Sequence, residues 1–264
     1  MIRFIDISIA QLDHEVKSVL SRGYGNDIAA LEEQMSTLCR MALTVMARST
    51  SLFYSFEHTV MCARVALQII GSICSRHGFI RHPEALHILA GSLFSNVGII
   101  QGLLQDDKKG RMVTGEGKVI KVETNSSDSI LWKHRTSRSY IYVERENILQ
   151  NLLNSDVMSS AIDNSHISKI TTKTVSMTDK YCRAVQIISL MAHPNYTKNL
   201  TKLYWSAVEG DVIGEFGEKE LSKFRKNFKD YFWNHLYTDA SETISLLKET
   251  DGGRELVSAL YAHL

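Results

Sequence analysis

Two short polar segments flank a long apolar stretch, and their residues are the best suited to chemistry. Tyr54-Ser55-Phe56-Glu57-His58-Thr59 precedes the stretch and Leu93-Phe94-Ser95-Asn96-Val97-Gly98 follows it. The imidazole of His58 could bind a metal, but Ser95 and Asn96 add only neutral oxygens. Such a donor set suits zinc, iron or manganese poorly. These side chains can instead hydrogen-bond one another, so we expect a polar pocket that holds no metal.

Other residues could complete a metal site or supply a different chemistry. The alternative ligands are His82, His87, His134, Glu57, Asp106 and Asp107. We expect His87 to be a partly buried structural residue, and Asp106 and Asp107, followed by two lysines, to form a solvated turn. The sequence contains no Gly-x-Ser-x-Gly nucleophile motif and no glycine-rich nucleotide loop with its Lys-Ser or Lys-Thr pair.

Charge and cysteine content restrict the class of protein. Lys and Arg number 30 and Asp and Glu number 29, a balance that argues against nucleic-acid binding. We expect neither a membrane span, since no apolar stretch reaches about 18 residues without charge, nor a signal peptide. The four cysteines, Cys39, Cys62, Cys74 and Cys182, show no metal-knuckle spacing and suit a reduced core. We therefore expect a cytoplasmic protein.

Apolar residues repeat at helical spacing along most of the chain, and only two prolines interrupt it. Predicted helices cover about residues 26–48, 53–76, 82–96, 144–153, 155–163, 165–175, 178–192, 196–209, 217–236, 238–249 and 252–262. Glycines and β-branched residues predict a short extended excursion or hairpin near 111–123. The fold class is therefore all-α. We divide the chain into a helical extension, 1–50, packed on a main helical domain, 51–264.

Several motifs over residues 49–236 together resemble the HD superfamily of metal-dependent phosphohydrolases. These motifs are the two segments above, Val113-Thr114-Gly115-Glu116-Gly117, Arg183-Ala184-Val185-Gln186-Ile187-Ile188, and Tyr231-Phe232-Trp233-Asn234. The resemblance implies an HD-domain-like helical bundle. It also implies a site in which two imidazoles and two carboxylates hold a metal that activates water.

The resemblance implies that three of the four ligand positions are altered. His58 keeps its ligand, whereas Ser95 replaces a His, Asn96 replaces an Asp, and Gln186 replaces the last Asp. Two negative charges and one imidazole are lost. Each carboxylate contributes several kcal/mol to holding a cation at an effective dielectric constant of about 20, so metal affinity should fall by orders of magnitude.

Basic side chains suggest a different use for the same pocket. Lys133, Arg135, Arg138 and Arg183 could face it, and His134 matches a His of the related subgroup. Arginine presents a planar fork of donors that suits phosphate. We take His134, Arg138 and Arg183 as candidate anion-binding residues, although ordinary surface charge is the simpler explanation for most of them.

Three functions stay open. The first is a catalytically inactive HD-fold protein, a pseudoenzyme without metal or other cofactor, that binds a small anionic ligand or a protein in a regulatory role. The second is a phosphohydrolase with an altered metal ligand set. The third is a structural partner in an assembly. A homodimer is an open option, because soluble proteins commonly form them.

Overall fold

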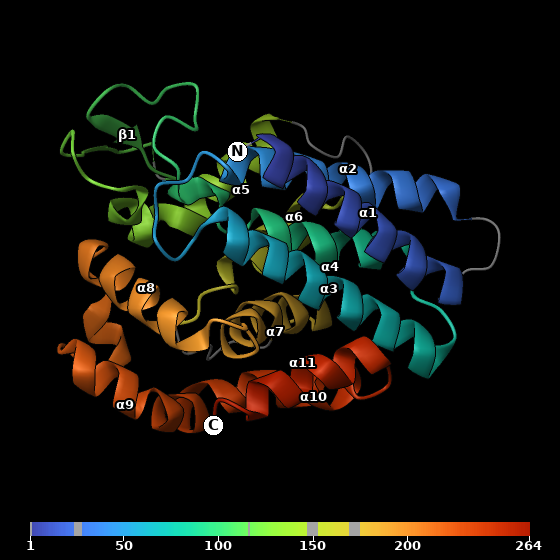
Figure 1. The fold of residues 1–264 in the computed structure, drawn as a ribbon. Coiled ribbons are helices and arrows are strands. Elements are labelled where there is room, and N and C mark those ends of the chain that lie inside the picture. Colours follow the sequence, from blue (N-terminus) through green and yellow to red (C-terminus); the bar gives the residue numbers. More distant parts are fainter. Residues whose placement is uncertain (1, 24–27, 116, 147–152, 169–174) are drawn as a thin grey trace.

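Stacked layers of helices form the body of the molecule, with a small hairpin at one corner (Figure 1). The computed structural model describes residues 2–23, 28–115, 117–146, 153–168 and 175–264. The α-helices are α1 (Ile2–Gly23), α2 (Ala29–Met46), α3 (Phe56–His77), α4 (His82–Phe94), α5 (Arg135–Arg145), α6 (Ser155–Asp163), α7 (Met177–Met191), α8 (Tyr196–Glu209), α9 (Leu221–Tyr231), α10 (Tyr237–Leu247) and α11 (Asp251–Tyr261). The all-α fold class predicted from the sequence is confirmed.

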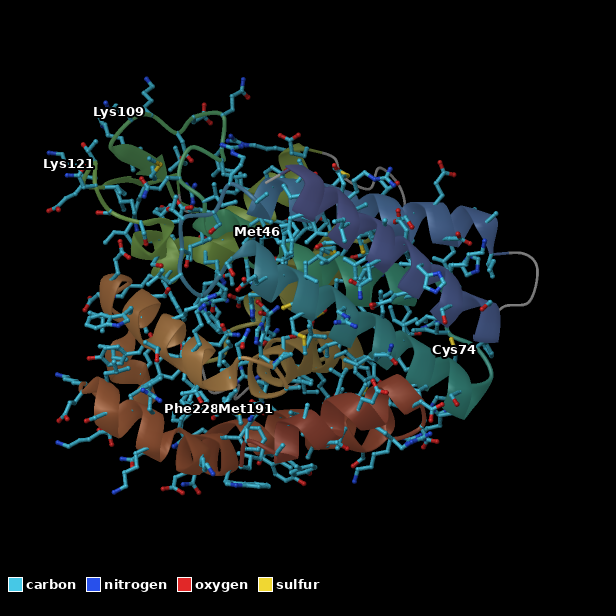
Figure 2. The ribbon with its side chains drawn as sticks, in the orientation of Figure 1. Met46, Cys74, Lys109, Lys121, Met191 and Phe228 are labelled. Atoms are coloured by element: carbon cyan, nitrogen blue, oxygen red, sulfur yellow. The ribbon has the colours of Figure 1, made fainter. Side chains whose placement is uncertain are left out.

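Shorter elements connect these helices. Three 3-10 segments cover Val97–Ile99, Asp128–His134 and Ile213–Phe216, and a π-helical turn covers Phe232–Leu236. The strands β1 (Arg111–Val113) and β2 (Val119–Lys121) pair antiparallel, with Met112 opposite Ile120. The predicted hairpin near 111–123 is therefore confirmed. Figure 2 shows Lys109 and Lys121 pointing outward at this corner, whereas Met46 and Met191 lie inside.

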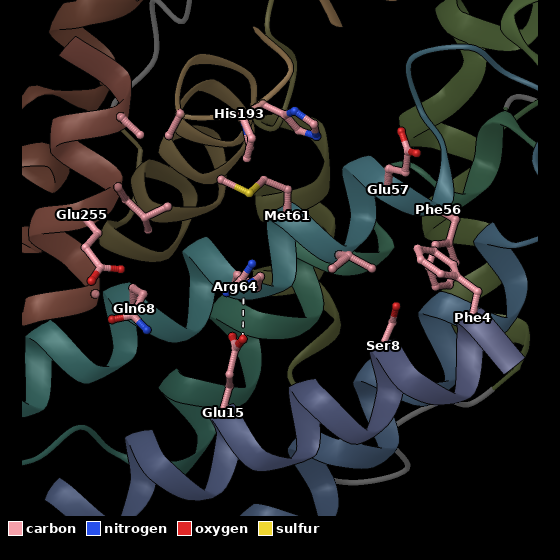
Figure 3. Close-up of a pocket in the computed structure, with 16 residues that line it drawn as sticks. Phe4, Ser8, Glu15, Phe56, Glu57, Met61, Arg64, Gln68, His193 and Glu255 are labelled. Atoms are coloured by element: carbon pink, nitrogen blue, oxygen red, sulfur yellow. Dashed lines mark ion pairs between the residues drawn. The ribbon is translucent and has the colours of Figure 1, made fainter. Parts of the chain in front are cut away.

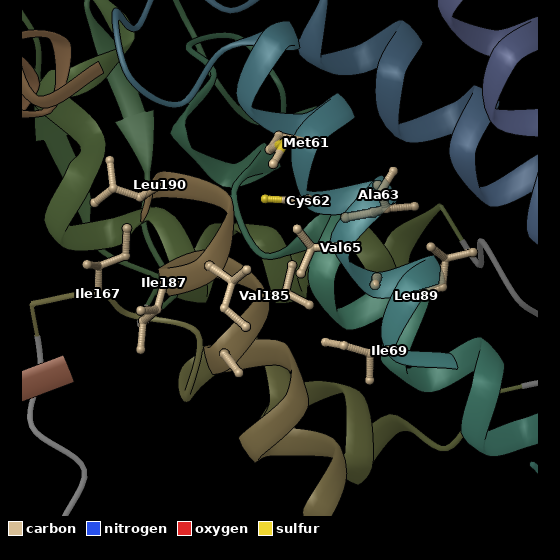
Figure 4. Close-up of a cluster of buried hydrophobic side chains, with 14 of the residues drawn as sticks. Met61, Cys62, Ala63, Val65, Ile69, Leu89, Ile167, Val185, Ile187 and Leu190 are labelled. Carbon is tan, nitrogen blue, oxygen red and sulfur yellow. The ribbon is translucent and has the colours of Figure 1, made fainter. Parts of the chain in front are cut away.

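The central helix is α3, which packs against α1, α2, α4, α7, α10 and α11. The Ser55 hydroxyl caps its first turn by accepting a hydrogen bond from the backbone N–H of His58, and Gly78 ends it at a φ of 84°. Such a positive φ favours glycine because it has no Cβ. Apolar residues of α3, α4 and α7 pack into one buried cluster, which includes Cys62, Leu89 and Val185 (Figure 4).

By length and composition α3 could cross a membrane, but its setting in the protein is that of a core helix. Its most apolar window is 72% buried among the other elements. Within the residues described, α3 is the one helix that is long and apolar enough to span a membrane. A helix that is hydrophobic nearly all round and covered by other helices is typical of the core of a soluble protein.

The N-terminal helices α1 and α2 pack on each other, and both pack on α3. Leu12, Val16 and Leu20 from α1 and Met35 and Leu38 from α2 are buried in the same hydrophobic cluster as the residues of α3. The division of the chain at residue 50 remains a prediction.

The predicted start of the helix at 144–153 is wrong. Helix α5 begins at Arg135, directly after the 3-10 segment, and residues 147–152 lie outside the described part of the chain. Its buried side chains are Arg135, Thr136, Arg138 and Ser139, all of them polar. Apolar periodicity therefore gave no sign of the face that α5 turns inward.

Two further helix predictions need correction. The structure has no helix at 165–168 or at 175–176, and the rest of the predicted helix 165–175 lies outside the described residues. The predicted helix 217–236 begins only at Leu221, because Gly217 adopts a φ of 78° at the end of the preceding turn. It also changes to a π-helical turn at Phe232.

A buried ion pair fastens the hairpin to α5, so Asp107 does not belong to a solvated turn. Both Asp107 carboxylate oxygens accept from the guanidinium of Arg138, at 3.0 and 2.8 Å, and both side chains are fully covered. Burial opposes ionisation of Asp107, but the hydrogen bonds from Arg138 and from Val113 N–H outweigh it and lower the pKa. Asp106, its neighbour, forms an exposed ion pair with Arg145.

Replacing Asp107 should destabilise the protein strongly, since it would leave the buried guanidinium of Arg138 without an anion. We expect Asp107→Asn to lower the free energy of unfolding in urea by about 3 kcal/mol. The matched control is Asp106→Asn, which removes the exposed pair on the adjacent residue and should cost less than about 1 kcal/mol. Equal losses in the two variants would contradict the role given to the buried pair.

Candidate functional site

The four residues predicted to line the polar pocket lie together in the protein interior. His58 is in the first turn of α3, Ser95 and Asn96 directly follow α4, and Gln186 is in the middle of α7. Each is at most 2% exposed. The packing of α3, α4 and α7 on one another brings these positions together, although His58 and Gln186 are 128 residues apart in the sequence.

The side-chain amide of Gln186 links the other three residues. Its oxygen Oε1 lies 3.1 Å from His58 Nε2 and 3.0 Å from Asn96 Nδ2. Its nitrogen Nε2 donates to the Ser95 hydroxyl at 3.1 Å and to the backbone carbonyl of Ser92 at 3.2 Å. An amide offers two acceptor and two donor positions. All four are used, so Gln186 has no capacity left for a ligand.

These contacts also assign the proton on His58. The Ser92 carbonyl can only accept, so it fixes which end of the Gln186 amide is the nitrogen. The other end, Oε1, then faces His58 Nε2, which must carry the proton and donate it. Burial lowers the pKa of His58 to about 4, against the opposing effect of the Gln186 hydrogen bond. The imidazole is therefore neutral near pH 7, with Nδ1 unprotonated.

Cys62 also belongs to this group, although its sequence context predicted only a reduced core residue. Its sulfur lies 3.5 Å from His58 Nε2 and 3.8 Å from Gln186 Oε1. The signal was its place one turn after His58 on the same helix, since residues four apart share a face. Burial raises the pKa of the Cys62 thiol to about 12, so the sulfur is a protonated thiol and not a thiolate.

Of the basic residues considered, Arg135 is the one that reaches the site. It is fully buried, and it donates from Nε to the Ser95 carbonyl at 3.2 Å and from Nη1 to the Tyr54 hydroxyl at 2.8 Å. Its guanidinium also lies over the Tyr54 ring, 4.5 Å from the centroid. Gly98 allows the backbone of α5 to pack closely against the Val97–Ile99 segment, because a Cβ on Gly98 would lie 2.1 Å from the Arg135 carbonyl oxygen.

The candidate anion-binding residues are placed differently. Arg138 donates to Asp107 and to the carbonyls of Gly98 and Ile100, at 2.7 and 2.9 Å. Arg183 donates to Asp239 and to the carbonyl of His166. His134 is half-buried at the end of its 3-10 segment.

The side chains of this polar group, with Cys62 included, do not fit a divalent cation. They supply one neutral imidazole, a hydroxyl, two amides and a protonated thiol, with no carboxylate among them. Over the described ranges, no group of three His, Cys, Asp or Glu residues is arranged to hold a metal ion. Transition-metal sites combine three or four imidazole, thiolate or carboxylate ligands, and hard cations prefer anionic oxygens. No hydrolytic step through a metal follows from this donor set.

Three buried polar atoms beside the network have no hydrogen-bond partner among the described residues: His58 Nδ1, Asn96 Oδ1 and Arg135 Nη2. Buried polar groups are usually satisfied, by protein or by ordered water. These two acceptors and one donor beside the network match the hydrogen-bonding capacity of a water molecule.

The chain belongs to the Npun_R2479-like family, whose model matches residues 3–264. The name of that family states no activity. No curated protein matches the chain, and no solved structure does. The resemblance to the HD superfamily remains a prediction from the sequence motifs.

Truncating Gln186 should destabilise the fold, because it removes four buried hydrogen bonds of the network. We expect Gln186→Ala to lower the free energy of unfolding by about 3 kcal/mol, from the lost hydrogen bonds and the cavity together. Gln105, in an exposed turn, provides the matched control, and Gln105→Ala should change it by less than about 0.5 kcal/mol. A stable Gln186→Ala protein would refute the structural role of the amide.

Acid should weaken the fold through His58. Its pKa is 6.5 in an unfolded chain and about 4 in the native state. The unfolded state therefore binds more protons between these values, and stability falls as pH drops through that window, by about 3 kcal/mol from this residue. Urea unfolding from pH 7 to pH 4 measures this. His58→Gln should flatten the profile, whereas His14→Gln, at an exposed position, should not. Parallel profiles for wild type and His58→Gln would contradict the assignment.

Proposed function

We propose that this protein is a catalytically inactive HD-fold protein, a pseudoenzyme that acts by binding and not by hydrolysis. One observation carries the proposal: the Gln186 amide saturates itself with His58, Ser95, Asn96 and the Ser92 carbonyl. A site that served a metal and a substrate would present unsatisfied, charged groups to solvent. This one presents neutral groups to each other in the interior.

The partners of two candidate arginines bear on the kind of ligand that such a protein would bind. The Arg138 and Arg183 guanidinium groups both have carboxylate partners, Asp107 and Asp239, which argues against an anion at either. We therefore propose a regulatory role in the cytoplasm, in which the protein binds a small ligand or another protein at its surface. A homodimer and the absence of nucleic-acid and membrane partners belong to the same proposal.

Metal analysis tests the proposal. The purified wild-type protein should retain no stoichiometric transition metal, because its donor set has no anionic ligand. Ser95→His, Asn96→Asp and Gln186→Asp together rebuild the ligand set that the resemblance implies. This triple variant should take up about one equivalent of zinc or manganese, measured by mass spectrometry of the metal content after dialysis.

Two controls make the outcome decisive. His58→Ala in the triple variant should abolish uptake, and thermal melts with and without metal should show that only the triple variant is stabilised by it. A stoichiometric metal in the wild-type protein, lost on His58→Ala together with phosphatase turnover, would refute the pseudoenzyme. A folded triple variant that takes up no metal would refute the HD resemblance.

A further inference from the structure

A cleft of about 540 Å³ opens on the surface between α1, α3, α11 and the turn after α7 (Figure 3). Its volume falls in the range of small-molecule sites, about 300–1,000 Å³. It is built from segments far apart in the sequence, and it is distinct from the His58–Gln186 network. Glu57 and His58, neighbours on α3, point in different directions, so Glu57 lines the cleft while His58 enters the interior.

The cleft has an apolar lining with an aromatic end. Val60, Met61, Leu256 and Ala259 line its sides. Phe4 and Phe56 pack at 5.6 Å between ring centroids at one end, and Phe4 is 59% exposed. A large exposed aromatic ring beside a concave apolar surface is typical of a binding site. The body of a ligand here would be apolar.

Among the charged groups that line the cleft, one carboxylate has no ion-pair partner in the described part of the chain. Glu15 pairs with Arg64 at 3.1 Å, and Glu57 pairs with Lys202 at 2.7 Å. Glu255 forms no ion pair with any residue in the described part of the chain. His193 adds no positive charge, because burial lowers its pKa and leaves it neutral near pH 7. The lining therefore carries a net negative charge, which favours a cation.

A second acceptor lies at the same end of the cleft as Glu255. Figure 3 shows Gln68 near Glu255, with Phe4 and Phe56 at the opposite end. A Cβ on Gly252 would lie 2.6 Å from Gln68 Oε1, so the glycine leaves that oxygen room. The Thr250 hydroxyl donates to the same oxygen at 3.4 Å, which leaves one of its two acceptor positions for a ligand. A carboxylate and an amide carbonyl that line the same cleft match the several N–H donors of an ammonium group.

We propose that this cleft binds an amphiphilic primary ammonium ion. The ammonium group lies between Glu255 and Gln68, and the alkyl or aryl body lies along Met61 and Leu256 toward Phe4 and Phe56. Charge sets the preference, since an anionic head would meet Glu255 and a neutral head would lose the ion pair. The inference does not depend on the HD resemblance, because none of these residues belongs to the network.

Three probes with one alkyl chain and different heads test the charge preference on the full-length protein: decylammonium and decanoate below their micelle concentrations, and 1-decanol below its solubility limit. In isothermal titration at pH 7, decylammonium should bind about two- to fivefold more tightly than 1-decanol, and decanoate more weakly still. Equal or tighter binding of decanoate would overturn the proposal, as would failure of decylammonium to bind.

Matched variants test the location. Glu255→Gln should reduce decylammonium affinity to that of 1-decanol and leave 1-decanol binding unchanged, whereas Phe4→Ala should weaken both. The control is Glu123→Gln, at an exposed position near β2, which should change neither. Circular dichroism confirms that each variant is folded. Unchanged decylammonium binding in Glu255→Gln, or equal losses in Glu255→Gln and Glu123→Gln, would refute this site.

Discussion

The arrangement of the interior depends on one neutral side chain that ties three elements together. Gln186 on α7 accepts from His58 on α3 and from Asn96 beyond α4, and donates to Ser95 and Ser92. These groups are completely removed from water, where an unmade hydrogen bond is expensive and a lone charge more so. An amide can satisfy donors and acceptors at once. A carboxylate at the same place could only accept, and it would need a cation to offset its burial.

Two buried arginines on α5 illustrate different ways of keeping a cation inside a protein. Arg138 is neutralised by Asp107 and surrounded by backbone carbonyls, which fastens the hairpin to the helical body. Among the described residues, Arg135 has no carboxylate within hydrogen-bonding distance, and its guanidinium lies instead over the ring of Tyr54. Cation–π contact and the Ser95 carbonyl offset part of its desolvation. Burial lowers the pKa of Arg135 accordingly.

The same helix supports the interior network and the surface cleft. Because successive residues on a helix point in different directions, α3 presents His58 and Cys62 to the core and Glu57 and Met61 to the cleft. The polar groups that the sequence singles out are therefore buried in the interior, and the groups that a ligand could reach lie on an adjacent face of α3.

From local patterns, the sequence predicted the helical class and the hairpin, because apolar periodicity and glycine placement are local properties of the chain. Through the resemblance of its motifs to the HD superfamily, the sequence also indicated the four residues at the polar centre. It could not reveal α5, whose inward face is polar, nor Asp107, whose partner Arg138 is 31 residues away. The cleft was also beyond reach, since Phe4, Met61, His193 and Glu255 come from four distant segments. Only the packing of the helices decides which charged side chains lie within ion-pairing distance, and therefore which carboxylates have a partner.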